Sequence, residues 1–299
     1  MRYKIKENIN LAGYVFISPW LIGFFAFLVI PVIISLYYSF TNYDLVGVPV
    51  FVGWKNYQKI FIDKRFWQAI KVTFIYTFTA LPLRLSFALL LAVLFNQKHK
   101  FVGIYRTIFY IPSLIGGSVA VSVVWRQLFG YNGALNDILI SMGILEQPIG
   151  FIGKPQTALW TLVLLAAWQF GSPMLIFLAG LKQIPLRLYE SAAIDGASWW
   201  QKFYKITIPM LTPIIFFNLV MQTIRLFMMF TQAYIITHGG PIDSTLVYVL
   251  YLFKQAFDYK AMGYASALAW ILLLVLGFVT YLLFSSSRYW VFYESEEGL

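Results

Sequence analysis

The chain has 299 residues, of which 60% are hydrophobic and only 11% are charged, and it contains no cysteine. A soluble domain of this length could not bury so much apolar surface, so the composition excludes a soluble globular protein, and the lack of cysteine excludes disulfides and thiol chemistry. The formal net charge of +10 does not indicate a nucleic-acid-binding surface, because positive charge in a membrane protein largely reflects its orientation.

Apolar runs long enough to cross the ~30 Å hydrocarbon core of a bilayer recur along the chain and predict an all-α membrane protein. We predict six transmembrane helices in a single domain over residues 1–299, at about residues 12–40, 69–95, 107–129, 157–181, 209–237 and 262–285. The first run is longer than a bilayer is thick and has no small-residue cleavage site, so we expect a retained helix that is tilted, kinked or projects beyond one face of the membrane. Several spans contain proline, which is tolerated where neighbouring groups satisfy the carbonyls that it leaves unpaired.

The distribution of lysine and arginine predicts the orientation. Six spans place both termini on one side of the membrane, and the basic residues on that side are Arg2, Lys4, Lys6, Lys98, Lys100, Arg106, Lys182, Arg187, Lys202, Lys205 and Arg288. The bias over the other side is modest but consistent, so we place both termini in the cytoplasm. The loops at residues 42–68, 130–156 and 238–261 then face outward.

The loops leave no room for a nucleotide-hydrolysing domain, because none exceeds about 30 residues. The sequence also lacks the glycine–lysine loop that cradles phosphate and the dinucleotide-binding fingerprint. If the chain transports a solute with the energy of ATP, we therefore expect ATP and Mg²⁺ to bind to another chain, and no cofactor on this one.

A polar segment at residues 185–208 separates the fourth and fifth predicted spans on the cytoplasmic side. Pro185 favours the first turn of a helix, and Gly196 permits a sharp change of direction or a close approach by another backbone. Arg187 and Glu190 are spaced to pair along a helix. The pattern alone fits either an amphipathic helix on the membrane surface or a docking surface for a partner protein.

This segment resembles the EAA loop of permease subunits in ATP-binding-cassette importers, whose pattern is Glu-Ala-Ala, three residues, Gly, and later Ile-x-Leu-Pro. The corresponding residues are Glu190, Ser191, Ala192, Gly196, Ile206, Ile208 and Pro209, with Ser191 and Ile208 as mild departures. Other stretches resemble maltose-type sugar permeases, and they lie at residues 18–44, 51–61, 105–117, 178–197 and 237–245. The likeness therefore covers most of the chain.

The resemblance implies a permease subunit in the cytoplasmic membrane of a prokaryote. It implies a heterodimer of two related permeases, two ATPase subunits, and an extracytoplasmic solute-binding protein that delivers a sugar or oligosaccharide. In this family the EAA loop forms a short coupling helix that sits in a cleft of the ATPase. The residues that we expect to couple to the ATPase are Glu190, Ser191, Ala192, Asp195, Gly196 and Ala197.

Two arginines inside predicted spans, Arg84 and Arg225, are candidates for function because charged groups in lipid are costly. Each has a structural alternative, a contact to a helix carbonyl or a polar neighbour for Arg84 and interhelical hydrogen bonding for Arg225. Polar and aromatic neighbours of Arg225 could line a sugar path, since sugars stack on aromatic rings and hydrogen-bond to polar groups. These candidates are Asn218, Gln222, Phe227, Phe230, Gln232 and Tyr234, with packing or lipid contact as the alternative for each aromatic.

An arginine on the path would suit a carboxylate, which it binds in two places, so we hypothesise an acidic, uronate-containing cargo. An ion-coupled secondary sugar transporter is the alternative function, but the predicted spans contain no carboxylate for coupling. A membrane enzyme is disfavoured because no catalytic cluster is present. His99 and His238 are far apart and show no metal-ligand spacing, so we expect neither a catalytic nor a metal site.

Overall fold

The computed structural model describes residues 2–97 and 100–292, with side chains from residue 13 onward. The chain divides into two compact units, residues 1–63 with 252–273 and residues 64–251 with 274–299. Helices make up nearly all of the regular structure, together with one two-stranded antiparallel sheet of β1 (Thr41–Asn42) and β2 (Val50–Phe51). The predicted all-α membrane class is therefore confirmed.

The first unit contains a long helix at the beginning of the chain, formed by α1 (Arg2–Phe24), the π-helical turn η1 (Phe25–Val29) and α2 (Ile30–Ser39). The same unit also contains the β1–β2 hairpin, α3 (Lys55–Ile62), the π-helical turn η4 (Lys254–Asp258) and the first part of α14 (Met262–Trp290). The side chain of Asn56 donates to the carbonyls of Ser39 and Thr41, at 2.9 and 2.8 Å, and so fixes the end of α2. The most apolar stretch of the long helix is hydrophobic enough to cross a membrane.

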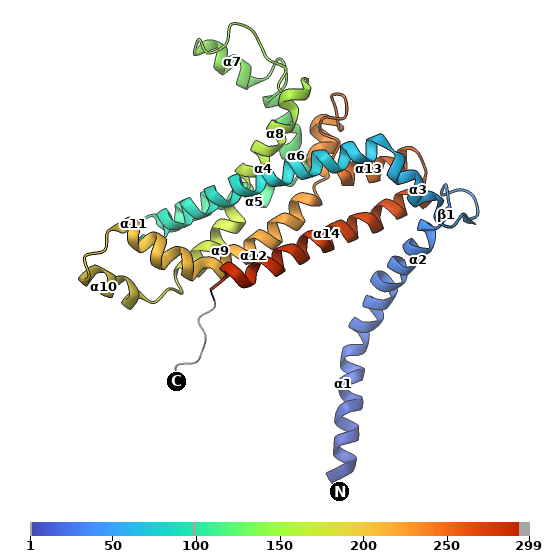
Figure 1. Ribbon diagram of the computed structural model, residues 1–299, viewed down its shortest axis with the longest axis horizontal. Coiled ribbons are helices and arrows are strands. Elements are labelled where there is room, and N and C mark those ends of the chain that lie inside the picture. Colours follow the sequence, from blue (N-terminus) through green and yellow to red (C-terminus); the bar gives the residue numbers. More distant parts are fainter. Residues whose placement is uncertain (1, 98–99, 293–299) are drawn as a thin grey trace. The chain divides into compact units, whose positions relative to one another are not determined.

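The second unit is built around α4 (Lys64–Phe95), which packs along α8 (Pro155–Trp168), α9 (Gly171–Leu181) and α12 (Ile208–Phe227) (Figure 1). Its remaining elements are α5 (Val102–Ile115), α6 (Val119–Leu128), α7 (Ala134–Ser141), α10 (Leu186–Ile194), α11 (Trp199–Lys202), the π-helical turns η2 (Phe203–Thr207) and η3 (Ala233–Thr237), and α13 (Tyr248–Phe253), whose end passes into the first unit. Gly171 permits a close approach of α9 to α5, because a Cβ there would lie 2.8 Å from the carbonyl oxygen of Phe109.

Five helical stretches of the described chain are long and apolar enough to cross a membrane, at residues 13–39, 64–95, 155–181, 199–227 and 262–290. A sixth crossing results if α5 and α6 count as one span, but they meet at 95°. The third predicted span is thus not one straight helix. Gly116 and Gly117 interrupt it, and the hydroxyl of Ser118 then caps α6 by accepting from the amide of Val121.

The fifth span also differs from its predicted bounds of 209–237. Its helical stretch begins at Trp199, inside the predicted coupling loop, because Ser198 and Gln201 form a capping box that starts a helix there. The α-helix ends at Phe227, well before the predicted end, and residues 228–230 are not helical. The membrane crossing is therefore displaced toward the N-terminus, and its far end is an irregular segment.

Candidate functional site

Three interrupted spans meet in the second unit. The breaks lie between α5 and α6 at Gly116, between α8 and α9 at Gln169, and after α12 at Met228. Irregular backbone at membrane depth is tolerated only where it is buried in protein or lines a polar cavity, because its unpaired groups cannot be left in hydrocarbon. In ion-coupled transporters such broken helices surround the substrate.

Pro173 explains the break at Gln169. A regular helix would pair the carbonyl of Gln169 with the amide of residue 173, but proline has no N–H to donate. Two side chains satisfy this carbonyl instead, since the Nε of Arg84 donates to it at 2.8 Å and the Oγ of Ser113 donates at 2.9 Å. The same Ser113 hydroxyl accepts from the amide of Ser172 at 2.9 Å. Arg84 therefore makes the contact to a helix carbonyl that is the structural alternative to a role in transport, and this contact joins α4 to the broken span.

The side-chain amide of Gln169 extends the network to the other two breaks. Its Nε2 donates to the carbonyl of Gly116 at 3.0 Å, and the Nε2 of Gln232 reaches the same carbonyl at 3.5 Å. A Cβ on Gly116 would lie 2.5 Å from the Cγ of Gln169, so only glycine fits this crossing. The three breaks are thus one connected structure.

A cavity of about 340 Å³ opens beside this network. Arg84, which is only 6% exposed, and the more exposed Arg225 both contribute to its wall. Its other polar lining residues are Tyr76, Ser113, Gln169, Thr231 and Gln232, and its apolar ones include Leu226, Met229 and Phe230. Among the described residues that line it, none is acidic. The cavity can therefore hold a polyhydroxylated solute beside two positive charges.

Four predicted path residues, Arg84, Arg225, Phe230 and Gln232, line this cavity, and the ring of Tyr234 stacks on that of Phe230 with centroids 5.3 Å apart. Tyr234 itself does not line the cavity, nor do the other three predicted residues. Phe227 packs edge-on against Phe74, and Asn218 and Gln222 are buried. Both amide atoms of Asn218 and the Oε1 of Gln222 have no hydrogen-bond partner in the described chain.

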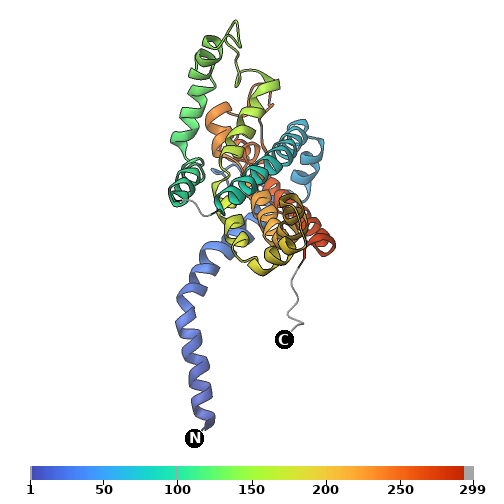
Figure 2. The same cartoon turned by 90° about the vertical axis from the view of Figure 1, so that its left-hand side faces the viewer.

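Helices α10 and α11 and the turn at residues 195–198 between them form an elbow, which follows α9 in the chain (Figures 1 and 2). Helix α10 ends in a Schellman motif, in which the amides of Gly196 and Ala197 donate to the carbonyls of Ala193 and Ala192. Gly196 has φ +73°, the left-handed conformation that glycine adopts without strain. The glycine thus makes the change of direction that the sequence predicts.

The elbow is tied to the fifth span, because the hydroxyls of Tyr189 and Thr207 lie 2.9 Å apart. Arg187, Glu190, Ser191 and Ile194 make one exposed stripe along α10, and Ile194 is 88% exposed. The inside of the elbow is a hollow of about 300 Å³. Predicted coupling residues in its wall are Ala192, Asp195, Gly196 and Ala197.

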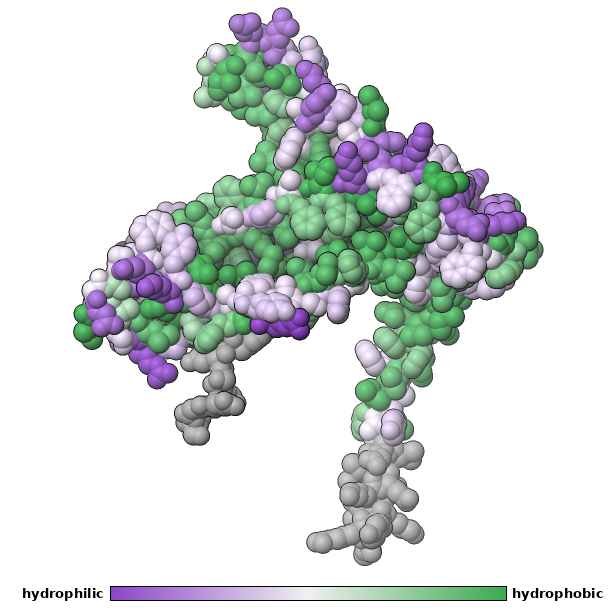
Figure 3. Space-filling view, in the orientation of Figure 1, coloured by the Kyte–Doolittle hydropathy of each residue, from purple (hydrophilic) through white to green (hydrophobic). Residues whose placement is uncertain are grey.

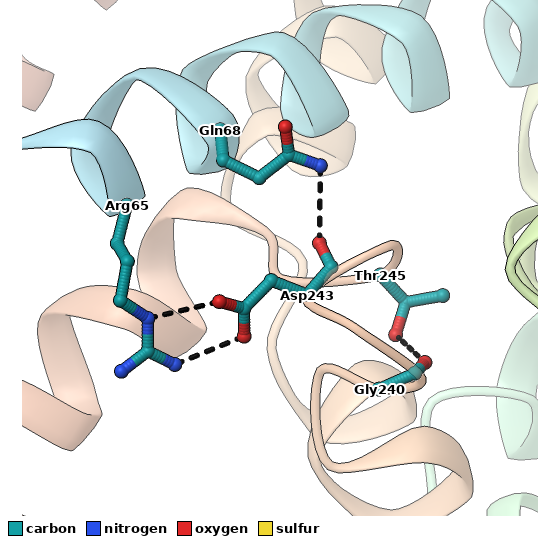
Figure 4. Close-up of polar contacts among 5 residues, drawn as sticks. All are labelled: Arg65, Gln68, Gly240, Asp243 and Thr245. Atoms are coloured by element: carbon teal, nitrogen blue, oxygen red, sulfur yellow. Dashed lines mark hydrogen bonds and ion pairs between the residues drawn. The ribbon is translucent and has the colours of Figure 1, made fainter.

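A loop at residues 238–245 lies at the start of α4 and is held by a bidentate ion pair (Figure 4). The Nε and Nη2 of Arg65 donate to the two carboxylate oxygens of Asp243, each at 2.9 Å. Gln68 donates to the carbonyl of Asp243, and Thr245 donates to the carbonyl of Gly240. The loop therefore has a defined shape, although an ion pair this exposed adds little stability by itself.

The structure bears only in part on the metal site and on the two histidines. Among the described residues, no group of three or more His, Cys, Asp or Glu side chains could hold a metal ion. His238 lies in the loop that Arg65 holds, with φ +52°, whereas His99 lies outside the described residues.

The helical membrane fold, the polar cavity at the broken spans and the exposed elbow define a multi-pass membrane transport protein. A family model described as the binding-protein-dependent transport system inner membrane component matches residues 61–287. The chain belongs to this family, whose members are permease components of ATP-binding-cassette transporters.

The relatives of this chain include permeases of sugar transport systems. The chain is 57% identical over 291 residues to the probable ABC transporter permease YesP of Bacillus subtilis, covering 96% of this chain and 94% of that protein. It is 31% identical to the lactose transport system permease LacF of Rhizobium radiobacter, covering 96% and 97%. A chain of a bacterial ABC transporter that imports the acidic polysaccharide alginate has the same fold, with a TM-score of 0.80 at 22% identity over 96% of this chain and 99% of that one.

Proposed function

We propose that this chain translocates a sugar or oligosaccharide, received from an extracytoplasmic binding protein, through the cavity where its three broken spans meet. Separate ATPase subunits drive the movement by docking on the α10 elbow. The cavity is the observation that carries the proposal, because polar side chains line it at the point where three spans are interrupted, and a purely structural bundle would need neither the polar lining nor the interruptions.

The cargo is acidic, and uronate-containing oligosaccharides are the class that fits best. Arg84 and Arg225 present two guanidinium groups to one cavity whose described lining has no acid to neutralise them. The Nε of Arg84 already donates to the Gln169 carbonyl, so Arg84 has fewer N–H groups for a cargo. Arg225 is therefore the main carboxylate ligand. The alginate importer has an acidic cargo too, but at 22% identity its likeness supports the fold alone.

Force transmission explains the elbow. ATP-driven closure of an ATPase pair must move the spans, so the connecting element has to be stiff. The hydrogen bonds of the Schellman turn at Gly196 and of the capping box at Ser198 restrain the backbone between α10 and α11. The π-helical turn η2 then continues directly into α12. Helix α12 ends beside the cavity, so a movement of the elbow would reach Arg225.

The assembly that we propose contains a second, related permease and two ATPase subunits with their ATP and Mg²⁺, in the cytoplasmic membrane of a prokaryote. The exposed apolar faces of the spans support contact with lipid and a partner helix bundle. The loop that Arg65 holds belongs to the outward side and receives the binding protein. The ion-coupled alternative lacks support, because the helices that could cross the membrane contain no Asp or Glu.

Replacing Arg225 with glutamine tests the cargo class. We expect uptake of an oligogalacturonate by the reconstituted transporter to fall about tenfold or more, since a charged hydrogen bond contributes roughly 1.5–3 kcal/mol. ATP hydrolysis in the absence of cargo should be unchanged. Uptake is measured in proteoliposomes with radiolabelled cargo and the purified binding protein.

The matched control is Arg126→Gln, which removes an exposed arginine at the end of α6, away from the residues that line the cavity. We expect it to transport as the wild type does. Equal uptake of the acidic cargo by the wild type and Arg225→Gln would exclude Arg225 as the carboxylate ligand.

A further inference from the structure

A second cavity, of about 510 Å³, lies between the α10 elbow and the ends of α4 and α9. Val93 and Leu181 line it, and they stand in the last turn of two membrane-spanning stretches that end at Phe95 and Leu181. The cavity is therefore at the depth where the hydrocarbon core gives way to phospholipid headgroups. It is separate from the residues that line the cargo cavity.

The chemistry of this cavity is divided. Lys182 and Lys202 supply two positive charges, and no acid stands among the described residues of its wall. Val93 and Leu181 supply an apolar side that continues into the spans, and Leu186 of α10 adds to it. A cavity at the membrane boundary that is lined by two cations and by apolar side chains matches a molecule that has an anionic head and hydrocarbon chains.

An aromatic cluster marks the same boundary. Trp199 lines the cavity and its ring stacks on Phe203, with centroids 5.4 Å apart and planes at 5°. Trp199 and Trp200 are 55% and 61% exposed. Tryptophan at the end of a span favours the headgroup region of a bilayer, because its ring is largely apolar while its N–H can be hydrated there. The hydrophilic surface around α10 and α11 adjoins hydrophobic surface in Figure 3.

We propose that this cavity binds the phosphate of an anionic phospholipid, with Lys182 and Lys202 as its ligands and the acyl chains along α4 and α9. The lipid fills the space under the elbow and braces it against the spans. Lys182 follows α9 and Lys202 ends α11, so one phosphate would tie the two sides of the elbow together. This binding depends neither on the cargo nor on the ATPase.

Native mass spectrometry of the purified, detergent-solubilised transporter tests the proposal. Dioleoyl phosphatidylglycerol and dioleoyl phosphatidylcholine are titrated separately, and the first bound lipid is quantified. We expect the wild type to bind phosphatidylglycerol about tenfold more tightly than phosphatidylcholine, and Lys182→Gln/Lys202→Gln to lose that preference. Lys182→Arg/Lys202→Arg should keep it, which separates loss of charge from loss of folding.

The control, Arg187→Gln/Lys205→Gln, removes two positive charges from the same segment at residues that do not line this cavity. We expect its lipid preference to be that of the wild type. An unchanged preference in Lys182→Gln/Lys202→Gln, or an equal loss in the control, would overturn the proposal. Displacement of phosphatidylglycerol by 10 mM inorganic phosphate would also overturn it, by identifying a site for free phosphate.

Discussion

Replacing Arg84 with methionine should destabilise the protein and abolish most uptake. The side chain is buried, and it donates to a carbonyl that Pro173 leaves without its helical partner. Losing this charged donor costs about 2 kcal/mol, and Ser113 alone then holds the break between α8 and α9. We expect a lower thermal midpoint in detergent and uptake reduced about tenfold or more, measured by fluorescence-detected size-exclusion chromatography and proteoliposome transport.

Arg84→Lys and Arg126→Met are the controls for this experiment. Lysine keeps the charge and a donor, so it should recover part of the stability, whereas Arg126 is exposed and its loss should change little. A thermal midpoint for Arg84→Met equal to that of Arg126→Met would show that the carbonyl contact does not support the broken span.

Replacing Gly196 with valine should uncouple the permease from its ATPase. A β-branched residue at φ +73° is strained by about 1–2 kcal/mol, so the Schellman turn would open and the elbow would change direction. Nothing lies within 4 Å of a Cβ at this position, so the effect is on the backbone and not on packing within this chain. We expect ATPase subunits to be lost during co-purification and ATP-dependent uptake to fall about tenfold.

Gly143 offers a matched control, because it has φ +71° and also has nothing within 4 Å of a Cβ. Gly143→Val introduces the same backbone strain between α7 and α8, far along the chain from the elbow, and should leave the ATPase bound. Gly196→Asn should be tolerated better than Gly196→Val, since asparagine adopts the left-handed conformation more readily. Full ATPase association in Gly196→Val would contradict docking through this elbow.

The sequence predicts the helices of this protein well but not their interruptions. Long apolar runs identify the spans because hydrocarbon thickness sets their length. The breaks depend on single residues whose effect needs a partner. Pro173 indicates that the carbonyl of Gln169 lacks its helical hydrogen bond, yet only the structure shows that Arg84 and Ser113 donate to it.

The candidate path shows a similar division. Arg84 and Arg225 are recognisable because charge is rare inside a span, and both line the cavity. Asn218 and Gln222 share a helix with Arg225, but their side chains are buried outside the lining, because periodicity does not tell which side of a polar stripe a neighbouring helix covers. Gln169 and Ser113 are uncharged, so the sequence marks them only by their positions four residues before Pro173 and three residues before Gly116.

The motif predicts which residues dock on the ATPase, and the surface that we propose for docking includes further residues of α10. Glu190 and Ser191 lie on the exposed stripe of α10, while Ala192 and Gly196 line the hollow inside the elbow. Ile194 is the most exposed large apolar side chain of this helix and belongs to no part of the motif pattern. Its exposure depends on which face of α10 turns away from the rest of the unit, and the sequence alone does not determine that face.

Cargo protection of a single cysteine tests most directly whether the cavity is the path. The chain has no cysteine, so Thr231→Cys places one thiol in the cavity wall and Ser141→Cys places one on the exposed helix α7. Each variant is assembled with its partners, and labelling by a methanethiosulfonate reagent is followed by mass spectrometry with empty or cargo-loaded binding protein and ATP. We expect loaded binding protein to slow labelling at Thr231→Cys several-fold and to leave Ser141→Cys unchanged. Equal labelling rates at Thr231→Cys with empty and loaded binding protein would contradict passage of the cargo through this cavity.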